Sequence, residues 1–212
     1  MKIISYNIHK GMNAKNVFTL TKIINYLKKS DADIICIQEV LYNQFLFLKR
    51  SLNINGVFAA NIKSKMLVYG IATLSKNRIL DKGHVFLKSK GEQRGFLHTN
   101  IFFKSGSIDV INTHLGLNNN ERKEQLDEII DYTKWLTKAI IICGDFNEKN
   151  IFINTFNDSA IYTHSQNIAT FEKSNARIDY ILVDKSLCID KYEVEKINLS
   201  DHYPIISNIK LN

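Results

Sequence analysis

Short apolar segments recur along the chain, and several of them end in a polar or ionisable side chain. Residues 140–144 lead into Asp145, residues 35–38 lead into Glu39, and residues 108–113 lead into His114. Apolar runs of this length are typical of buried strands. Because ligand sites gather where the strands of a sheet end, the pattern predicts sheets whose ends bring these side chains together.

Helical and strand patterns alternate between these segments. Apolar residues at helical spacing predict helices over residues 17–29, 42–52 and 121–138. Shorter apolar runs predict strands over residues 3–8, 34–40, 67–74, 85–87, 96–103, 108–114, 139–143, 180–183 and 205–211. The strands meander between the helices without a strict strand–helix–strand repeat. We therefore expect an α/β (α+β) fold in which stacked sheets are flanked by helices.

The chain has 212 residues, of which 45% are hydrophobic and 23% charged, values ordinary for a globular protein. No linker or repeat divides it, so we expect a single domain over residues 1–212. The N-terminus lacks the apolar core of a signal peptide, and no apolar run could span a bilayer, which favours a cytoplasmic protein. Cys36 and Cys143 lie in apolar runs without metal-binding spacing, so we expect buried, reduced thiols.

The net charge of +7 is unevenly distributed. Residues 1–100 carry 16 Lys and Arg against 5 Asp and Glu, whereas residues 101–212 carry 12 against 16. A basic surface favours an anionic partner. Such a partner could be a nucleic acid, an anionic membrane surface or another phosphate ester. Richness in Lys, Asn and Ile is also typical of a protein from an AT-rich genome. The charge alone therefore does not decide whether the protein binds nucleic acid. No feature indicates an obligate protein partner.

The polar residues at the strand ends share one kind of chemistry. Carboxylate and amide oxygens suit Mg²⁺ or Mn²⁺ better than zinc. They come from Asn7, Glu39, Asp145, Asn147 and Asp201. Histidines without cysteine partners suit proton transfer or phosphate contact. Hydrolysis of a phosphate ester needs this combination, because it requires a cation, an oriented water and a stabilised leaving oxygen.

The segments Ile8-His9-Lys-Gly11 and His114-Leu-Gly-Leu117 resemble a compact bacterial branch of the endonuclease/exonuclease/phosphatase superfamily. Six motifs resemble, in order, those of the superfamily as a whole. They are Ser5-Tyr-Asn7-Ile, Ile37-Gln-Glu39-Val, Asn112-Thr-His114-Leu, Gly144-Asp145-Phe-Asn147, Arg177-Ile-Asp179-Tyr-Ile and Ser200-Asp201-His202-Tyr-Pro204. Each motif is weak alone, but six in order over nearly the whole chain are specific. The resemblance implies a four-layer α/β/β/α sandwich of the DNase I-like kind, with the active site at one edge.

The resemblance also implies roles for the matching residues. The metal ligands would be Asn7, Glu39 and Asp201. The catalytic residues would be His114, Asp145, Asn147, Asp179 and His202. The residues contacting the substrate phosphate would be Arg94, His114, Asn147 and His202. Asp145 would position and deprotonate water, and Asp179 would hold His202; whether Asp145 or a histidine is the base stays open. Two of these residues have a structural alternative to the catalytic role. Arg94 could be a solvated arginine in a loop, and Asp179 could form only a local salt bridge with Arg177.

Three functions are compatible with these residues. The first is a metal-dependent, nuclease-type phosphodiesterase, which the basic charge favours. The second is a phosphoesterase acting on a phospholipid headgroup or a small phosphorylated metabolite, which would use the same residues. The third is a catalytically inactive binding module, which the complete set of catalytic residues argues against. The fold alone cannot choose between the first two, because one fold carries many substrates.

Overall fold

The computed structural model describes residues 1–104 and 106–211. The first sheet contains β1 (Lys2–Asn7), β2 (Ile34–Leu41), β3 (Asn55–Lys63), β4 (Val68–Ser75), β11 (Cys188–Val194) and β12 (Ile205–Lys210), in the order β11-β12-β1-β2-β4-β3. The second contains β5 (Ile79–Phe86), β6 (Gly95–Phe103), β7 (Gly106–His114), β8 (Ile140–Asp145), β9 (Phe156–Asp158) and β10 (Asp179–Asp184), in the order β5-β6-β7-β8-β10-β9.

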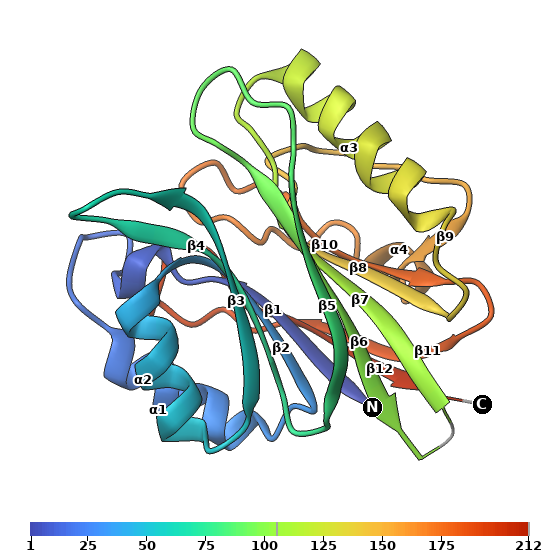
Figure 1. Ribbon diagram of the computed structural model, residues 1–212, viewed down its shortest axis with the longest axis horizontal. Coiled ribbons are helices and arrows are strands. Elements are labelled where there is room, and N and C mark those ends of the chain that lie inside the picture. The colour runs from blue at the N-terminus through green and yellow to red at the C-terminus, as the bar shows by residue number, and fades with distance from the viewer. Residues whose placement is uncertain (105, 212) are drawn as a thin grey trace.

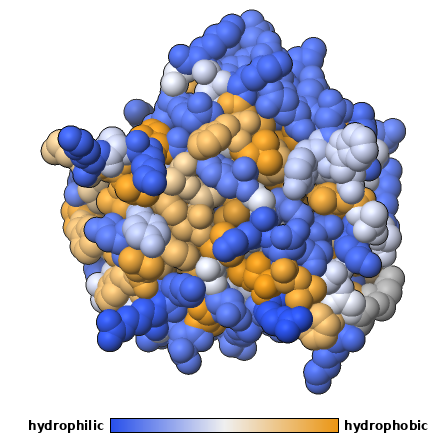
Figure 2. All heavy atoms as spheres, viewed as in Figure 1, coloured by the Kyte–Doolittle hydropathy of each residue, from blue (hydrophilic) through white to orange (hydrophobic). Residues whose placement is uncertain are grey.

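The helices cover the outer faces of the two sheets (Figure 1). Helices α1 (Leu20–Ser30) and α2 (Tyr42–Leu52) lie over the first sheet, and α3 (Asn119–Thr133) lies over the second. A short 3-10 helix, η1 (His9–Gly11), follows β1, and the one-turn helix α4 (Ser159–Tyr162) follows β9. The outward face of α3 is hydrophilic, at the top of Figure 2. The expected four-layer α/β/β/α sandwich is confirmed.

The alternation of side chains along each strand builds these layers. In β2, Ile34 and Cys36 belong to the core between the sheets, whereas Ile35 and Ile37 belong to the core under α1 and α2. Successive side chains of a strand point to opposite faces, so a strand with apolar residues at every position is buried on both. Cys36 and Cys143 are buried free thiols, as expected.

Strand direction brings the polar ends to one edge within each sheet. β1 runs parallel to β2, and β7 runs parallel to β8, so each pair ends at the same edge. β12 is antiparallel to β1, and β10 is antiparallel to β8, so both of these strands begin there. This edge therefore carries the ends of β1, β2, β7 and β8 together with the starts of β10 and β12.

Some expected boundaries were wrong. Helix α1 begins at Leu20, so Val17 lies outside it and is 56% exposed. Helix α3 ends at Thr133, and Trp135, which follows it, is 85% exposed. Strands β3, β9 and β11 were not expected, and β5 begins at Ile79 rather than at residue 85. Strand β9 is short, whereas polar or charged residues interrupt the apolar pattern of β3, β5 and β11. Within the described part of the chain, no helix is both long and apolar enough to cross a membrane.

Candidate active site

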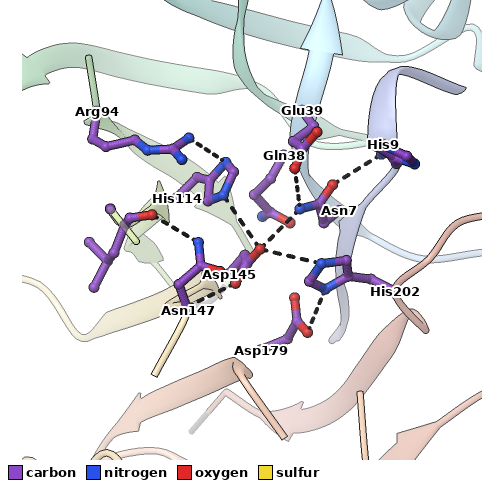
Figure 3. Close-up of polar contacts among 12 residues, drawn as sticks. Asn7, His9, Gln38, Glu39, Arg94, His114, Asp145, Asn147, Asp179 and His202 are labelled. Atoms are coloured by element: carbon purple, nitrogen blue, oxygen red, sulfur yellow. Dashed lines mark hydrogen bonds and ion pairs between the residues drawn. The ribbon is translucent and has the colours of Figure 1, made fainter. Parts of the chain in front are cut away.

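The sequence-predicted residues converge where the edges of the two sheets meet (Figure 3). Asn7 ends β1 and Glu39 lies near the end of β2, both in the first sheet. His114 ends β7, Asp145 ends β8 and Asp179 begins β10, all in the second sheet. His202 lies in the segment before β12. Hydrogen bonds and ion pairs across the two sheets connect these side chains.

Asp145 lies at the centre of this group and is 1% exposed. Its Oδ2 atom accepts a hydrogen bond of 3.0 Å from Asn7 Nδ2. The Nε2 atoms of His114 and His202 each lie 3.5 Å from the same oxygen. Burial raises the pKa of Asp145 to about 7, against the lowering effect of His202. A carboxyl group with this pKa can take up and release a proton near neutral pH.

His202 is held between two carboxylates. Its Nδ1 atom lies 2.9 Å from Asp179 Oδ2, and Thr170 Oγ1 in turn accepts a hydrogen bond from the Asp179 backbone N–H at 3.1 Å. Burial lowers the pKa of His202, but Asp179 and Asp145 outweigh burial and raise this pKa to about 10. At neutral pH the ring is therefore an imidazolium that donates from both nitrogens.

Arg94 determines the protonation of His114. Arg94 Nη1 lies 2.7 Å from Glu92 Oε1 and 3.1 Å from His114 Nδ1. A guanidinium can only donate, so His114 Nδ1 must accept and the ring proton must sit on Nε2. Burial, followed by the charges of Arg94 and His202, holds the pKa of His114 well below its usual range. His114 is therefore a neutral ring that presents an N–H toward Asp145.

The structural alternatives considered for Arg94 and Asp179 do not agree with the observed burial and contacts. Arg94 is only 6% exposed, so it is not a solvated loop arginine. Arg177 pairs with Asp158 at 2.8 Å and not with Asp179, which contacts His202.

The expected metal ligands lie around Asn7. Asn7 Nδ2 donates to Glu39 Oε1 at 3.1 Å. The Ser200 hydroxyl lies 2.8 Å from the Asn7 carbonyl oxygen and 3.2 Å from Asp201 Oδ1, which links Asp201 to the same group. His9 also reaches the group, because its Nδ1 atom lies 3.7 Å from Asp201 Oδ1.

Backbone geometry at two of these positions is strained. The pairing of β2 with β4 shifts register between Ile37 and Val40, and Glu39 within this irregularity has a φ of +52°. Asn147 has a φ of +50°; its N–H donates to Asp145 Oδ1 at 2.9 Å, and its Nδ2 donates to the Leu115 carbonyl at 3.0 Å. Residues held in this region cost free energy, and such residues cluster at functional sites.

A second set of residues supports the site and carries no motif in the sequence. Tyr69 lies close to Glu39, and burial, followed by the charge of Glu39, raises the pKa of Tyr69 far above its usual range. The ring of Phe171 lies 4.6 Å from the ring of His202. Glu92 and Thr170 belong to this set through the contacts described above. Their roles depend on neighbours distant in the chain, so only the tertiary structure reveals them.

Two groups of residues offer ligand atoms for a metal ion. Asp145, Asp179 and His202 each provide one candidate atom, and these atoms lie within 4.8 Å of one another. Glu39, Asn7 and Asp201 form the second group, with oxygen donors alone. The two groups meet at Asn7 Nδ2, which contacts both Glu39 and Asp145.

Two facing sheets with helices outside, and with carboxylates, amides and imidazoles at one edge, define a DNase I-like sandwich with a polar active site. Residues 4–202 match the Endonuclease/Exonuclease/phosphatase family, and the chain belongs to it. Members of this family hydrolyse phosphoric esters and generally depend on a divalent metal.

The proteins that resemble this chain differ in the activities for which they are named. The chain is 27% identical over 168 residues to the uncharacterised protein YbhP of Escherichia coli K12, and the alignment covers 69% of this chain but only 66% of YbhP. It is similar in fold to a mannosyl-6-phosphatase of Bacteroides thetaiotaomicron VPI-5482, with a TM-score of 0.83, 19% identity and 100% coverage of both chains. It is also similar to D. rerio TDP2 complexed with a single-strand DNA product, with a TM-score of 0.82, 18% identity, and coverage of 100% of this chain and 99% of that one.

Proposed function

We propose that this protein is a Mg²⁺- or Mn²⁺-dependent phosphoric ester hydrolase in which Asp145 activates water. The observation that carries the proposal is the environment of the Asp145 carboxylate, which is buried and surrounded by Asn7, His114 and His202. Hydrolysis joins the oxygen of water to phosphorus and breaks the bond from phosphorus to the alcohol oxygen. Asp145 accepts one proton of the water and the other stays on the oxygen that becomes bonded to phosphorus, while the leaving alcohol oxygen gains one proton, which balances the one that Asp145 accepts.

Glu39, Asn7 and Asp201 would hold the metal ion. Their oxygen donors are those that Mg²⁺ and Mn²⁺ prefer. The alternative group is less suitable, because both ring nitrogens of His202 already have a carboxylate neighbour, Asp179 at Nδ1 and Asp145 at Nε2. The site also carries more carboxylates than cations, with Glu39, Asp145, Asp179 and Asp201 around one imidazolium. A bound divalent cation would neutralise phosphoryl oxygens and polarise the ester.

Asp145 and Asn147 would prepare the attacking water. The pKa of about 7 lets Asp145 accept a proton near neutral pH. The backbone N–H of Asn147 holds Asp145 Oδ1 at 2.9 Å, which leaves Oδ2 to face the two histidines.

His202 and His114 would stabilise the phosphate. The His202 imidazolium carries a positive charge and an N–H on Nε2, which suits a phosphoryl oxygen that gains charge in the transition state. His114 offers a neutral N–H, fixed by Arg94. Arg94 would contribute positive charge from behind His114, which modifies the expectation that it binds phosphate directly.

Two substrate classes fit this chemistry. A nuclease-type phosphodiesterase is supported by the net charge of +7 and by the likeness to TDP2, whose structure holds single-strand DNA. A phosphoesterase for a small phosphorylated metabolite is supported by the likeness to a mannosyl-6-phosphatase. Neither likeness supports an anionic membrane surface as a partner.

The test is a hydrolysis screen with purified protein in Mg²⁺ and in Mn²⁺. Its substrates are duplex DNA, single strands, RNA, phospholipids, small phosphomonoesters and bis-p-nitrophenyl phosphate. We expect hydrolysis of at least one ester, with loss of activity in a chelator and recovery on adding metal. Hydrolysis that continues undiminished in metal-free buffer would refute the proposed mechanism.

A further inference from the structure

A cavity of about 320 Å³ lies beside the active site. It is bounded by the loop between β5 and β6 and by the segment leading into α3. The side chains that line it belong to Lys90, Glu92, Arg94, Leu117, Asn118 and Glu121, together with two glycines.

The wall of this cavity is continuous with the catalytic residues. Arg94 lines the cavity and lies 3.1 Å from His114 through its Nη1 atom. Gly116 also lines the cavity and directly follows Leu115. The carbonyl oxygen of Leu115 accepts a hydrogen bond from Asn147 Nδ2. A group attached to a phosphate at His114 would therefore lie next to the cavity.

The chemistry of the lining excludes two kinds of occupant. Among the described residues that line the cavity, none is aromatic, so a nucleobase would find no ring on which to stack. Two cations, Lys90 and Arg94, face two carboxylates, Glu92 and Glu121, so the lining carries no net charge. A second phosphate would gain little in such a cavity.

The lining is built from fixed polar groups. Glu121 is 8% exposed, and its Oε1 atom accepts a hydrogen bond of 3.1 Å from Gln125 Nε2. Gln125 Oε1 accepts a hydrogen bond of 2.8 Å from the Gly116 backbone N–H, and Gln125 Nε2 donates one of 2.8 Å to the Lys88 carbonyl oxygen. These bonds connect α3 to both loops that bound the cavity. The acceptor wall is therefore positioned before any ligand arrives.

One buried donor in the wall has no hydrogen-bond partner among the residues that the structure describes. Arg94 is 6% exposed, and its Nε atom is buried without a hydrogen-bond partner. A buried donor left unpaired costs about 1–3 kcal/mol, so such a group calls for a partner. This atom is closed to a cavity occupant unless the Arg94 side chain moves, so the donors that the cavity offers in place are the Lys90 ammonium and the Asn118 amide, and a ligand hydroxyl can both donate to and accept from such a lining.

We propose that this cavity binds the alcohol part of the substrate, and that this alcohol is a polyhydroxylated group of monosaccharide size. The substrate class is then a sugar phosphate. Hydroxyl groups match a neutral lining that mixes carboxylate acceptors with ammonium, guanidinium and amide donors. A volume of about 320 Å³ suits one such group. This inference rests on the proposed function, because it assigns a substrate to the same site.

Activity measurements give the first test. The kcat/KM of glucose 6-phosphate is compared with that of phenyl phosphate and thymidine 5′-monophosphate in Mg²⁺. We expect glucose 6-phosphate to be preferred at least tenfold. Glu121→Gln keeps the oxygen that Gln125 contacts but removes a charge, and Lys90→Ala removes a donor. Each should reduce the ratio of kcat/KM for glucose 6-phosphate to phenyl phosphate about tenfold, whereas Lys82→Ala, an exposed lysine outside the cavity, should leave it unchanged.

Binding measurements separate this inference from the proposed function. Glucose 6-phosphate is titrated calorimetrically into Asp145→Asn protein, which cannot activate water but keeps the cavity. Adding Glu121→Gln or Leu117→Trp should weaken binding about tenfold, and adding Lys82→Ala should not. Failure of wild-type protein to hydrolyse any ester rejects the proposed function. Equal binding in all variants, or a preference for thymidine 5′-monophosphate or single-strand DNA over glucose 6-phosphate, rejects the sugar-phosphate assignment.

Discussion

His202 lies in the segment that leads into β12 of the first sheet, and Asp179 begins β10 of the second sheet; the 2.9 Å contact between their Nδ1 and Oδ2 atoms joins the two at the edge that carries the candidate site. The contact holds the ring so that Nε2 points at Asp145, 3.5 Å away. An imidazolium thus lies between two carboxylates. In the proposed mechanism, Asp179 orients the His202 ring, and Asp145 acts on the attacking water.

Loss of either reacting group should abolish most of the activity. Asp145→Asn removes the base and His202→Ala removes the charged donor, so each should lower kcat roughly a hundredfold or more. The matched control is Asp81→Asn, an exposed carboxylate on β5, which should keep full activity. Circular dichroism should show unchanged folding. Near-normal turnover in either variant would mean that its role is misassigned.

The pH profile of kcat/KM should be bell-shaped. Asp145 must be ionised to act as a base, and burial raises its pKa to about 7, so activity should fall as the pH drops through this region. A bound divalent cation favours the carboxylate, so the acidic limb should lie at or below this value. His202 must be protonated, and its pKa of about 10 places the alkaline limb there. Asp145→Asn should remove the acidic limb from the residual activity; an unchanged limb would assign it to another group.

Metal dependence should follow Glu39. Glu39→Gln keeps the shape of the side chain but removes its charge, so the concentration of Mg²⁺ needed for half-maximal activity should rise at least tenfold. Calorimetric titration of Mg²⁺ into the protein without substrate should show the same weakening. The exposed residue Glu172 provides the matched control, and Glu172→Gln should bind metal as the wild type does. Equal Mg²⁺ affinity in Glu39→Gln would move the metal to the group around Asp179.

Arg94 should fix the tautomer of His114. Nitrogen-15 NMR of the imidazole ring should show His114 neutral and protonated on Nε2 at pH 7 in the wild type. Arg94→Ala removes the donor at Nδ1, so the ring should shift toward a mixture of tautomers and its pKa should rise. Lys191→Ala, a distant change, should leave the spectrum as it is. A wild-type ring protonated on Nδ1 would contradict this assignment.

Gly144 should be intolerant of a side chain. Its φ is +145°, and a Cβ atom there would overlap the carbonyl oxygen of Thr113 on the neighbouring strand β7. Gly144→Ala should therefore lower the free energy of unfolding by about 2 kcal/mol or more, measured by urea denaturation. At Gly91 an added Cβ meets no atom within 4 Å, so Gly91→Ala should change stability little. Similar stability of the two variants would show that β7 and β8 can separate at low cost.

Much of the secondary structure was predictable because its signals are local. Helix α2 spans the predicted residues 42–52, since apolar residues at helical spacing identify a helix whatever it packs against. The end of α3 was overestimated, because residues 134–138 keep helix-compatible side chains although the chain turns away after Thr133. Strand β11 lacked a clear signal, because its charged residues are compatible with an exposed edge strand or a loop.

The sequence by itself determined most of the candidate site, because each motif places a polar side chain at the end or the start of an apolar strand. It also determined the family, through six motifs in a fixed order. Only the tertiary structure decided what these residues do to one another. Arg94 became the partner of His114, and Tyr69 and Glu92 joined the site, through contacts between distant segments. The pKa values of Asp145 and His202 were likewise set by burial and by charges from the facing sheet, which no local pattern encodes.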